Sequence, residues 1–420
     1  MNLSFRSFIK RKIPMRAKAL VQRVRRAAEA PPIDDVVLSD YQLEADPSEQ
    51  IRLNLVIPNL ASSSAFGGVT TGLEIVLRLL IALRKSGDID FRVIFTEPDR
   101  ETDVSILEAA AQRLDIDDVD ADFLEIAGPT HTVRVRRGDV FVTYNWWTTL
   151  NAQRLVDAQA AHFGDRAKPL IYLIQEYEPQ IFPLSSAHML SREAYDTPAR
   201  LWGVFNSSNL FDYFSVQGHR VEKSFVFEPV INNKLRGYLD QVGGSERRKQ
   251  ILVYGRPGVR RNCFPALVRG LRAWVSAYPE FADWSVVSAG TPHRPVELGD
   301  GRQMTSVGKL SLEDYAQTLL TSSVGVSLMA SPHPSYPPLE MAHMGLHTVT
   351  NSYLCKDLTD FHPNIVSIAS IAEENLAGAI AQACRSSQEA PVGVPNAEFV
   401  RQEPYRFIDQ LAAELRANID

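Results

Sequence analysis

Short apolar runs alternate along the chain with longer stretches in which apolar residues recur at helical spacing. The short runs are rich in β-branched residues, as in 51–58, which is typical of strands buried in a parallel sheet. Similar runs occupy 91–97, 139–144, 169–175, 201–207 and 223–229. A helical pattern over 69–87, ending at Gly87, follows the first run, and helical stretches separate most of the others. The pattern predicts an α/β domain with a parallel sheet over residues 50–231.

The same alternation restarts after a polar stretch. Residues 232–249 contain Gly243 and Gly244 and are interpreted as an interdomain linker. Strands are predicted over 251–255, 284–290, 322–330 and 346–350, and helices over 262–277 and from about 371. This gives a second α/β domain over 250–403 and an amphipathic helix in a C-terminal segment, 404–420. The fold class is two Rossmann-like, doubly wound parallel-sheet domains, which place a ligand-binding cleft between the carboxyl ends of their strands.

Composition agrees with two globular domains and excludes some classes of partner. The chain has 420 residues, 45% of them apolar and 22% charged, enough for two cores of about 200 residues each. A net charge of −6 gives no support for nucleic acid as a partner. The three cysteines form no CxxC pair, so neither a disulfide framework nor a zinc site is predicted, and a reducing cytoplasm is expected.

The N-terminal segment, 1–49, has a different charge from the rest. Its first 30 residues contain nine Lys or Arg and one acid, Glu29. No apolar run there is long enough for a signal-peptide core or a spanning helix. Two interpretations stay open: a basic amphipathic segment that makes peripheral contact with anionic lipid, or a solvated tail.

The stretch 327–351 is the most informative about chemistry. A buried strand ends in a loop rich in proline, and Pro337 and Pro338 preset the start of a short helix. The N-terminus of a helix offers N–H groups and positive charge to a phosphate. Glu340 in the first turn can accept the two hydroxyls of a ribose, and Tyr336 can stack on a base. A surface acid and a loop anchor are the alternative interpretation of these two residues.

Two basic residues occupy comparable positions. Arg256 follows a strand end in VYGRPGVRRN, and Lys309 precedes a helix in VGKLS. Both are expected at the carboxyl edge of the sheet, where an Arg and a Lys can neutralise the charge that grows on a diphosphate leaving group. Each alone could equally be a solvated surface base.

In the first domain, glycines and aromatic residues follow the strands. Gly67 and Gly68 in FGGVTTG allow close approach of a ligand to the backbone at a helix start, although this signal is weak. Neither FGGVTTG nor YGRPGV supplies GxGxxG, which counts against a dehydrogenase. Aromatic rings and carboxylates suit sugar binding, and the predicted acceptor-binding residues are Tyr144, Trp146, Trp147, Glu176, Tyr177 and Glu178. Core packing is the alternative for the tryptophans.

No metal site is predicted. DIDDVDAD (115–122) contains overlapping D-x-D triplets of the kind that bind Mn²⁺, but an acid-rich solvated connection is favoured. The histidines show no ligand spacing. His333 is a donor-site candidate only because it shares a loop with Tyr336 and Glu340.

The motifs FGGVTTG, QEYEP, VYGRPGVRRN, VGKLS and SPHPSYPPLEMAHMG together resemble the WsaF-type rhamnosyltransferases, which belong to the retaining GT-B glycosyltransferases. The resemblance runs from about residue 50 to the C-terminus. It implies an acceptor-binding N-terminal domain, a C-terminal domain for a dTDP-β-L-rhamnose-like donor, and a final helix that crosses back onto the first domain. It further implies that Arg256 and Lys309 hold the diphosphate, that Tyr336 stacks on thymine and that Glu340 binds the ribose.

The chain departs from the wider family at one position. That family has two glutamates with seven residues between them, and Glu340 fills the second position while the first falls on Pro332. Because the first glutamate contacts the donor sugar, the departure leaves the identity of the sugar open. The resemblance implies a metal-independent, retaining reaction in which a donor phosphate oxygen acts as the base.

The expected function is therefore transfer of a sugar, L-rhamnose first, to a growing glycan or lipid-linked oligosaccharide of the cell envelope. The place of action would be the cytoplasm or the inner face of the plasma membrane. Three alternatives stay open: the same fold with a UDP- or GDP-sugar, a sugar-nucleotide epimerase, and a non-catalytic glycan-binding scaffold.

Overall fold

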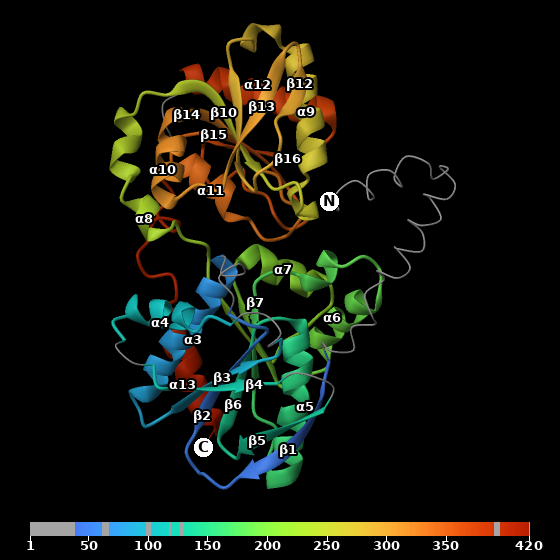
Figure 1. Ribbon diagram of the computed structural model, residues 1–420, viewed down its shortest axis with the longest axis vertical. Helices are drawn as coiled ribbons and strands as arrows, with labels where there is room; N and C mark the ends of the chain where they lie inside the picture. Colours follow the sequence, from blue (N-terminus) through green and yellow to red (C-terminus); the bar gives the residue numbers. More distant parts are fainter. Residues whose placement is uncertain are drawn as a thin grey trace, which may run out of the picture.

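The computed structural model describes residues 38–60, 67–97, 102–116, 119–126, 130–389 and 395–419, and places them in two stacked α/β domains (Figure 1). The basic segment predicted over residues 1–30, and Asp117 and Asp118 of the acid-rich connection, lie outside the described residues. None of the described helices is long and apolar enough to cross a membrane.

The N-terminal domain is built on a parallel sheet of seven strands in the order β4-β3-β2-β6-β7-β8-β9. The strands are β2 (Arg52–Ile57), β3 (Asp90–Phe95), β4 (Ala121–Glu125), β6 (Asp139–Thr143), β7 (Leu170–Ile174), β8 (Leu201–Phe205) and β9 (Lys223–Val226). The helices are α3 (Gly67–Arg84), α4 (Ser105–Gln112), α5 (Trp146–Phe163), α6 (Ser186–Asp196) and α7 (Ser208–Val216), with a 3-10 turn η1 (Glu178–Ile181) after β7. All residues of β2, β6, β7 and β8 are buried, which is why these strands appear in the sequence as mainly apolar runs. The exceptions include Arg52, Asn54 and Asp139, which are buried polar residues.

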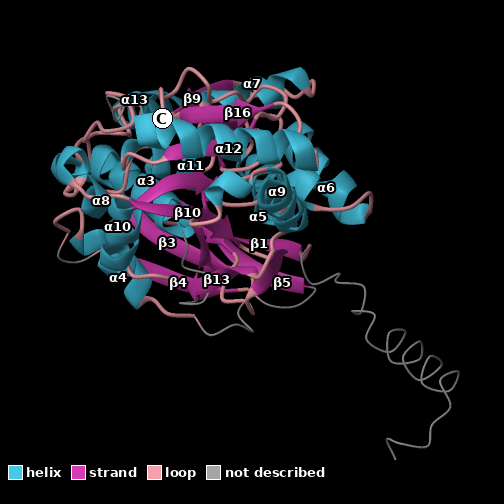
Figure 2. Ribbon diagram, turned by 90° about the horizontal axis from the view of Figure 1, so that it is seen from above, coloured by secondary structure: helices cyan, strands magenta, loops and turns pink. Residues whose placement is uncertain are grey.

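The C-terminal domain has a similar sheet in the order β12-β13-β11-β10-β14-β15-β16. Among its described strands, β12 pairs with β13 in an antiparallel orientation at the edge and the other pairs are parallel. Its strands are β10 (Arg248–Gly255), β11 (Ser285–Gly290), β12 (Val296–Gly299), β13 (Arg302–Gly308), β14 (Ser322–Val326), β15 (His347–Asn351) and β16 (Ile365–Ile368). Its helices are α9 (Phe264–Ala277), α10 (Leu312–Thr321), α11 (Tyr336–His343) and α12 (Glu373–Glu389), with 3-10 turns η3 (Arg260–Asn262) and η4 (Pro279–Phe281). Viewed from this domain, α9 and α12 lie to one side of β10 and α10 to the other (Figure 2).

Several regions differ from the sequence-based prediction, which included no strand at β4, β12, β13 or β16. Strand β1 (Asp40–Asp46) pairs in parallel with β5 (Thr130–Arg136) in a small separate sheet that the apolar pattern did not indicate, because exposed and half-buried positions alternate along β1. The stretch 232–249 is not an open linker. It contains α8 (Asn233–Arg236) and η2 (Leu239–Gly244), and Leu235 and Val242 are buried in the core of the C-terminal domain.

The C-terminal helix returns to the first domain (Figure 1). It is α13 (Ile408–Ile419), which begins four residues after the start of the segment 404–420 in which a helix was predicted. Leu411 and Leu415 are fully buried in the cluster that also contains one face of α3. Ahead of the helix, the rings of Tyr405 and Phe407 pack on Phe227 at centroid distances of 5.3 and 5.7 Å.

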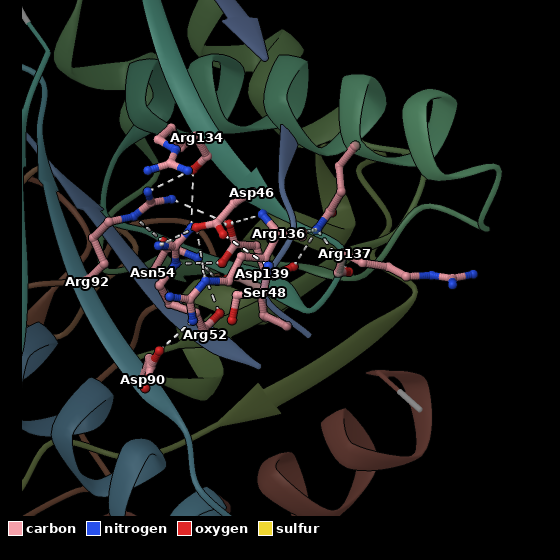
Figure 3. A network of polar contacts seen from close by, with 12 residues as sticks. Asp46, Ser48, Arg52, Asn54, Asp90, Arg92, Arg134, Arg136, Arg137 and Asp139 are labelled. Carbon is pink, nitrogen blue, oxygen red and sulfur yellow. Dashed lines mark hydrogen bonds and ion pairs between the residues drawn. The ribbon is translucent and has the colours of Figure 1, made fainter. Parts of the chain in front are cut away.

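A buried ionic network joins residues near the amino-terminal ends of β2, β3 and β6 (Figure 3). Because these strands are parallel, their amino-terminal ends lie at the edge opposite the carboxyl ends that face the cleft. Asp139 is fully buried and accepts from Arg52 Nε and Nη2, both at 2.8 Å, and from the Arg136 backbone N–H at 2.9 Å. Arg92 Nη2 approaches the same carboxylate at 3.5 Å, and burial lowers the pKa of the Arg92 guanidinium to about 10. The Asp139 carboxylate thus contacts two buried cations, and Asp46 Oδ2 lies 3.9 Å from Arg52 Nη1.

Candidate functional site

The site begins where the strand order of the C-terminal sheet reverses, between β10 and β14. Ligands of doubly wound sheets bind at this point, outside the carboxyl ends of the strands. Arg256 follows β10 directly, and the loop 327–335 follows β14. Gly290, at the end of β11, has φ +140°, and a Cβ there would lie 2.3 Å from the Gly255 carbonyl oxygen. Only glycine therefore allows this close pairing of strand ends.

A pocket of about 360 Å³ lies at these strand ends and brings the two predicted basic residues together. Its lining includes Tyr254, Arg256, Gly290, Lys309, Leu310 and Tyr315. Two cations and two tyrosine rings around an otherwise apolar cavity suit a planar, negatively charged ligand such as a nucleotide. The sequence predicted that Arg256 and Lys309 lie at the same edge of the sheet, and in the structure both line this pocket.

Helix α11 carries Tyr336 and Glu340 beside this pocket. Burial raises the pKa of the Glu340 carboxyl to about 7, and the Tyr315 hydroxyl beside it opposes this shift. The prediction of several free amides at the helix start needs correction. Pro337 and Pro338 have no N–H, so among the first three helical residues only Tyr336 supplies an amide donor. Ser335, with φ +67°, adds no side-chain cap.

The loop before α11 places a buried histidine. His333 is 6% exposed, and its ring Nδ1 accepts a hydrogen bond from the Ser335 backbone N–H at 3.0 Å. The backbone N–H of His333 donates to Ser331 Oγ at 3.0 Å. Burial lowers the pKa of His333 to about 3, and the positive charges of Lys356 and Arg261 act in the same direction. The neutral ring therefore carries its proton on Nε2, which is buried without a hydrogen-bond partner.

The glycines of the first domain are explained by packing. Gly67 is the first residue of α3. A Cβ on Gly68 would lie 3.1 Å from both the Tyr144 hydroxyl and Gln175 Oε1, so the glycine lets α3 pack against half-buried Tyr144. This packing accounts for a glycine at position 68, and its predicted role in admitting a ligand stays a prediction.

Three of the predicted acceptor-binding residues lie in the core. Trp146 packs edge-to-face on Trp147 at 5.4 Å, and Tyr177 is buried with its hydroxyl 2.9 Å from His219 Nε2. Glu178 accepts from the Trp146 N–H at 2.8 Å, and burial raises the pKa of its carboxyl to about 8. This corrects the assignment of Trp146, Tyr177 and Glu178 to an acceptor-binding surface, because none presents a face to solvent. Trp147 is half-buried.

Glu176 contacts the opposite domain. Its Oε1 accepts from Ser331 Oγ at 2.5 Å, and its Oε2 lies 3.8 Å from Arg261 Nε. Fully buried Lys356 stands close by and donates to the Met329 carbonyl at 2.7 Å. Burial lowers the pKa of the Lys356 ammonium to about 8, and the Glu176 carboxylate opposes this shift.

Sequence reasoning missed Ser331, Arg261 and Lys356. Arg261 lies in the same RPGVRRN segment as Arg256 and could have been found there. Lys356 follows β15 without any motif, and only the fold brings it to the cleft.

Comparison with known proteins gives the family and the fold. The model of the "WsaF, N-terminal domain" matches residues 52–208 and that of the "WsaF, C-terminal domain" matches residues 249–381. The O-antigen biosynthesis protein RfbC of Myxococcus xanthus is 30% identical over 181 residues, which are 43% of this chain. The match spans only 14% of that protein's length.

Two solved structures show a similar fold. Sucrose-phosphate synthase from Thermosynechococcus elongatus is 14% identical and superimposes with a TM-score of 0.51 over 88% of this chain and 98% of its own. The lipopolysaccharide outer core galactosyltransferase WaaB is 11% identical, with a TM-score of 0.52 over 87% and 99% of the two chains. At these identities the likeness shows the fold alone, which is GT-B: two Rossmann-like domains facing a cleft.

Proposed function

The chain belongs to the WsaF family, and on this premise we propose that it is a glycosyltransferase that moves L-rhamnose from dTDP-β-L-rhamnose to a growing glycan. The observation that carries the proposal is the pocket at the carboxyl ends of β10, β11 and β13, which is lined by Arg256, Lys309 and Tyr315. Glu340 of α11 lies beside Tyr315. The similarity to an O-antigen biosynthesis protein supports a cell-surface glycan as the acceptor.

In the proposed reaction the nucleoside occupies the pocket and the diphosphate lies against the two basic residues. The bond between the anomeric carbon and the phosphate oxygen breaks, and Arg256 and Lys309 neutralise the negative charge that develops on the diphosphate. An acceptor hydroxyl attacks from the side of the leaving group, its proton passes to a phosphate oxygen, and the configuration is retained. No metal is required, since the two cations supply the charge.

The donor site is tested first by nucleotide binding without metal. At a hundredfold excess over its dissociation constant, dTDP is expected to stabilise the wild-type protein by about 3 kcal/mol. Glu340→Ala should lose this response, because the variant lacks the acceptor for the ribose hydroxyls. Thermal-shift and calorimetric titrations with dTDP, UDP and GDP measure both effects.

Glu374→Ala is the matched control, since Glu374 is an exposed glutamate on α12, on the other side of the sheet. It should respond to dTDP as the wild type does. A stronger response to UDP or GDP would keep the transferase and reject rhamnose as the sugar. No response to any of the three nucleotides would contradict the proposed function and favour a glycan-binding scaffold.

Donor affinity is expected to rise with pH. Because the pKa of Glu340 lies at about 7, the carboxyl is largely neutral at pH 6 and largely ionised at pH 8. Ribose hydroxyls donate to the ionised form, so the affinity for dTDP-β-L-rhamnose should increase about tenfold between these pH values. Glu340→Gln should bind more weakly and with no such dependence. A pH profile that is the same in wild type and variant would assign the titration to another group.

A further inference from the structure

Glu176 belongs to the N-terminal domain, but its side-chain contacts are mainly with the C-terminal domain. Glu176 follows β7. Its carboxylate accepts from the backbone N–H of the next residue, Tyr177, and its other partners are Ser331 and Arg261 of the C-terminal domain. Only 15% of its side chain is exposed. A carboxylate held so closely across a cleft is costly to bury, so its placement calls for a role that a surface acid could not fill.

Two segments of chain lead from the nucleotide pocket to Glu176. The first runs from Arg256, which lines the pocket, to Arg261, five residues later at the carboxylate. The second runs from Glu340, beside the pocket residue Tyr315, back through the start of α11 to Ser331. Two short segments of chain thus connect residues at the pocket with the residues that contact Glu176, and we expect the sugar of a donor bound with its diphosphate at Arg256 to face this end of the cleft.

The far end of this path carries one free acceptor and one free donor. Glu176 Oε2 lies 3.8 Å from Arg261 Nε, outside hydrogen-bonding distance, so it can still accept a hydrogen bond. His333 Nε2–H is buried and has no partner. The loop joins these groups, because Ser331 Oγ donates to Glu176 and accepts from the His333 backbone N–H.

A sugar hydroxyl matches this pair, since it donates to a carboxylate and accepts from an imidazole N–H. A phosphate does not match, because it would meet the negative carboxylate. Buried polar groups that pair only with the correct ligand also give strong discrimination between related ligands.

We propose that Glu176 and His333 bind the hydroxyls of the transferred sugar, so that the N-terminal domain supplies a specificity-determining residue of the donor site. The inference rests on the proposed function and changes the expected role of Glu176 from acceptor binding to donor-sugar recognition. It also provides a carboxylate next to the loop position where the wider family has a glutamate and this chain has Pro332.

The test compares a nucleotide with and without its sugar. Calorimetry with dTDP and with dTDP-β-L-rhamnose gives the affinity gained from the sugar, in wild type and in Glu176→Gln. The variant should lose about tenfold to a hundredfold of that gain, because a charged hydrogen bond becomes a neutral one. Its affinity for dTDP alone should not change. Glu193→Gln, an exposed glutamate on α6 of the same domain, is the matched control and should bind both ligands as the wild type does.

Each result decides one question. If the sugar's contribution is unchanged in Glu176→Gln, or if only the KM for the acceptor rises, the inference is wrong and Glu176 belongs to the acceptor side. If the wild type prefers UDP or GDP, the same comparison is made with UDP-galactose or GDP-mannose. If the wild type binds no nucleotide, the proposed function itself fails. Should Glu176→Gln unfold, Glu176→Asp keeps the charge but shortens its reach, and the same loss of the sugar's contribution is expected.

Discussion

Arg256→Ala is expected to lower kcat by about 10²–10³-fold, the usual cost of removing one preorganised group that stabilises transition-state charge. Arg256 lines the pocket directly after β10, and the φ of Gly290 allows the two strand ends to meet beside it. The charge on the diphosphate grows as the sugar leaves, so the guanidinium stabilises the transition state more than the bound donor. The affinity for dTDP should therefore fall much less than kcat. Rates at saturating donor, together with calorimetry, separate the two effects.

Arg260→Ala is the matched control, since Arg260 is exposed and belongs to the same segment. It should keep the wild-type kcat. A variant at Arg256 that retains more than a tenth of kcat would assign charge stabilisation to other groups, with Lys309 next to be tested.

Asp139→Ala is expected to reduce the free energy of unfolding by about 3–5 kcal/mol, because it removes the buried carboxylate that both Arg52 and Arg92 contact. The variant removes the acceptor of two hydrogen bonds from Arg52 and one from the Arg136 backbone, while Arg92 stays buried nearby. Urea denaturation followed by circular dichroism measures the change. Since the network lies at the edge opposite the cleft, nucleotide affinity in the folded protein should be preserved.

The chain offers a matched control in Asp165. Its carboxylate also accepts two hydrogen bonds from one arginine, Arg137, both at 2.7 Å, but the arginine side chain is 65% exposed. Asp165→Ala should lower the free energy of unfolding far less than Asp139→Ala, because solvent screens an exposed ion pair. Equal losses in the two variants would mean that burial does not set the strength of the network.

The architecture was predictable wherever strands are buried on both faces. Continuous apolar runs such as 201–207 correspond to β8 (Leu201–Phe205), because a parallel sheet covered by helices has no polar face. Strand β1 was missed because it is only partly buried and leaves no such run. The stretch 232–249 was misread as a linker because its few apolar residues, Leu235 and Val242, are diluted by polar neighbours although both are buried.

The site was predictable where one short segment carries several signals at once. Arg256, Lys309 and Glu340 each stand at a strand end or helix start, and parallel strands bring such positions to one edge. Residues whose contacts lie far away in the sequence, in the same domain or in the other one, gave no local signal. Trp146 could not be separated from a surface aromatic by spacing, and the contact of Glu176 with Ser331 joins residues 155 positions apart.

The return of the chain to the first domain has a consequence for movement. The polypeptide passes between the domains twice, after β9 and again before α13, and the Ile231 N–H donates to the Phe399 carbonyl at 2.8 Å where the two passages run side by side. Two connecting segments that run side by side restrict the domains to rotation about one axis, whereas a single linker would allow rotation about any axis. Any opening of the cleft is therefore expected to be a rotation about that axis, and closing it would restore the contact between Glu176 and Ser331.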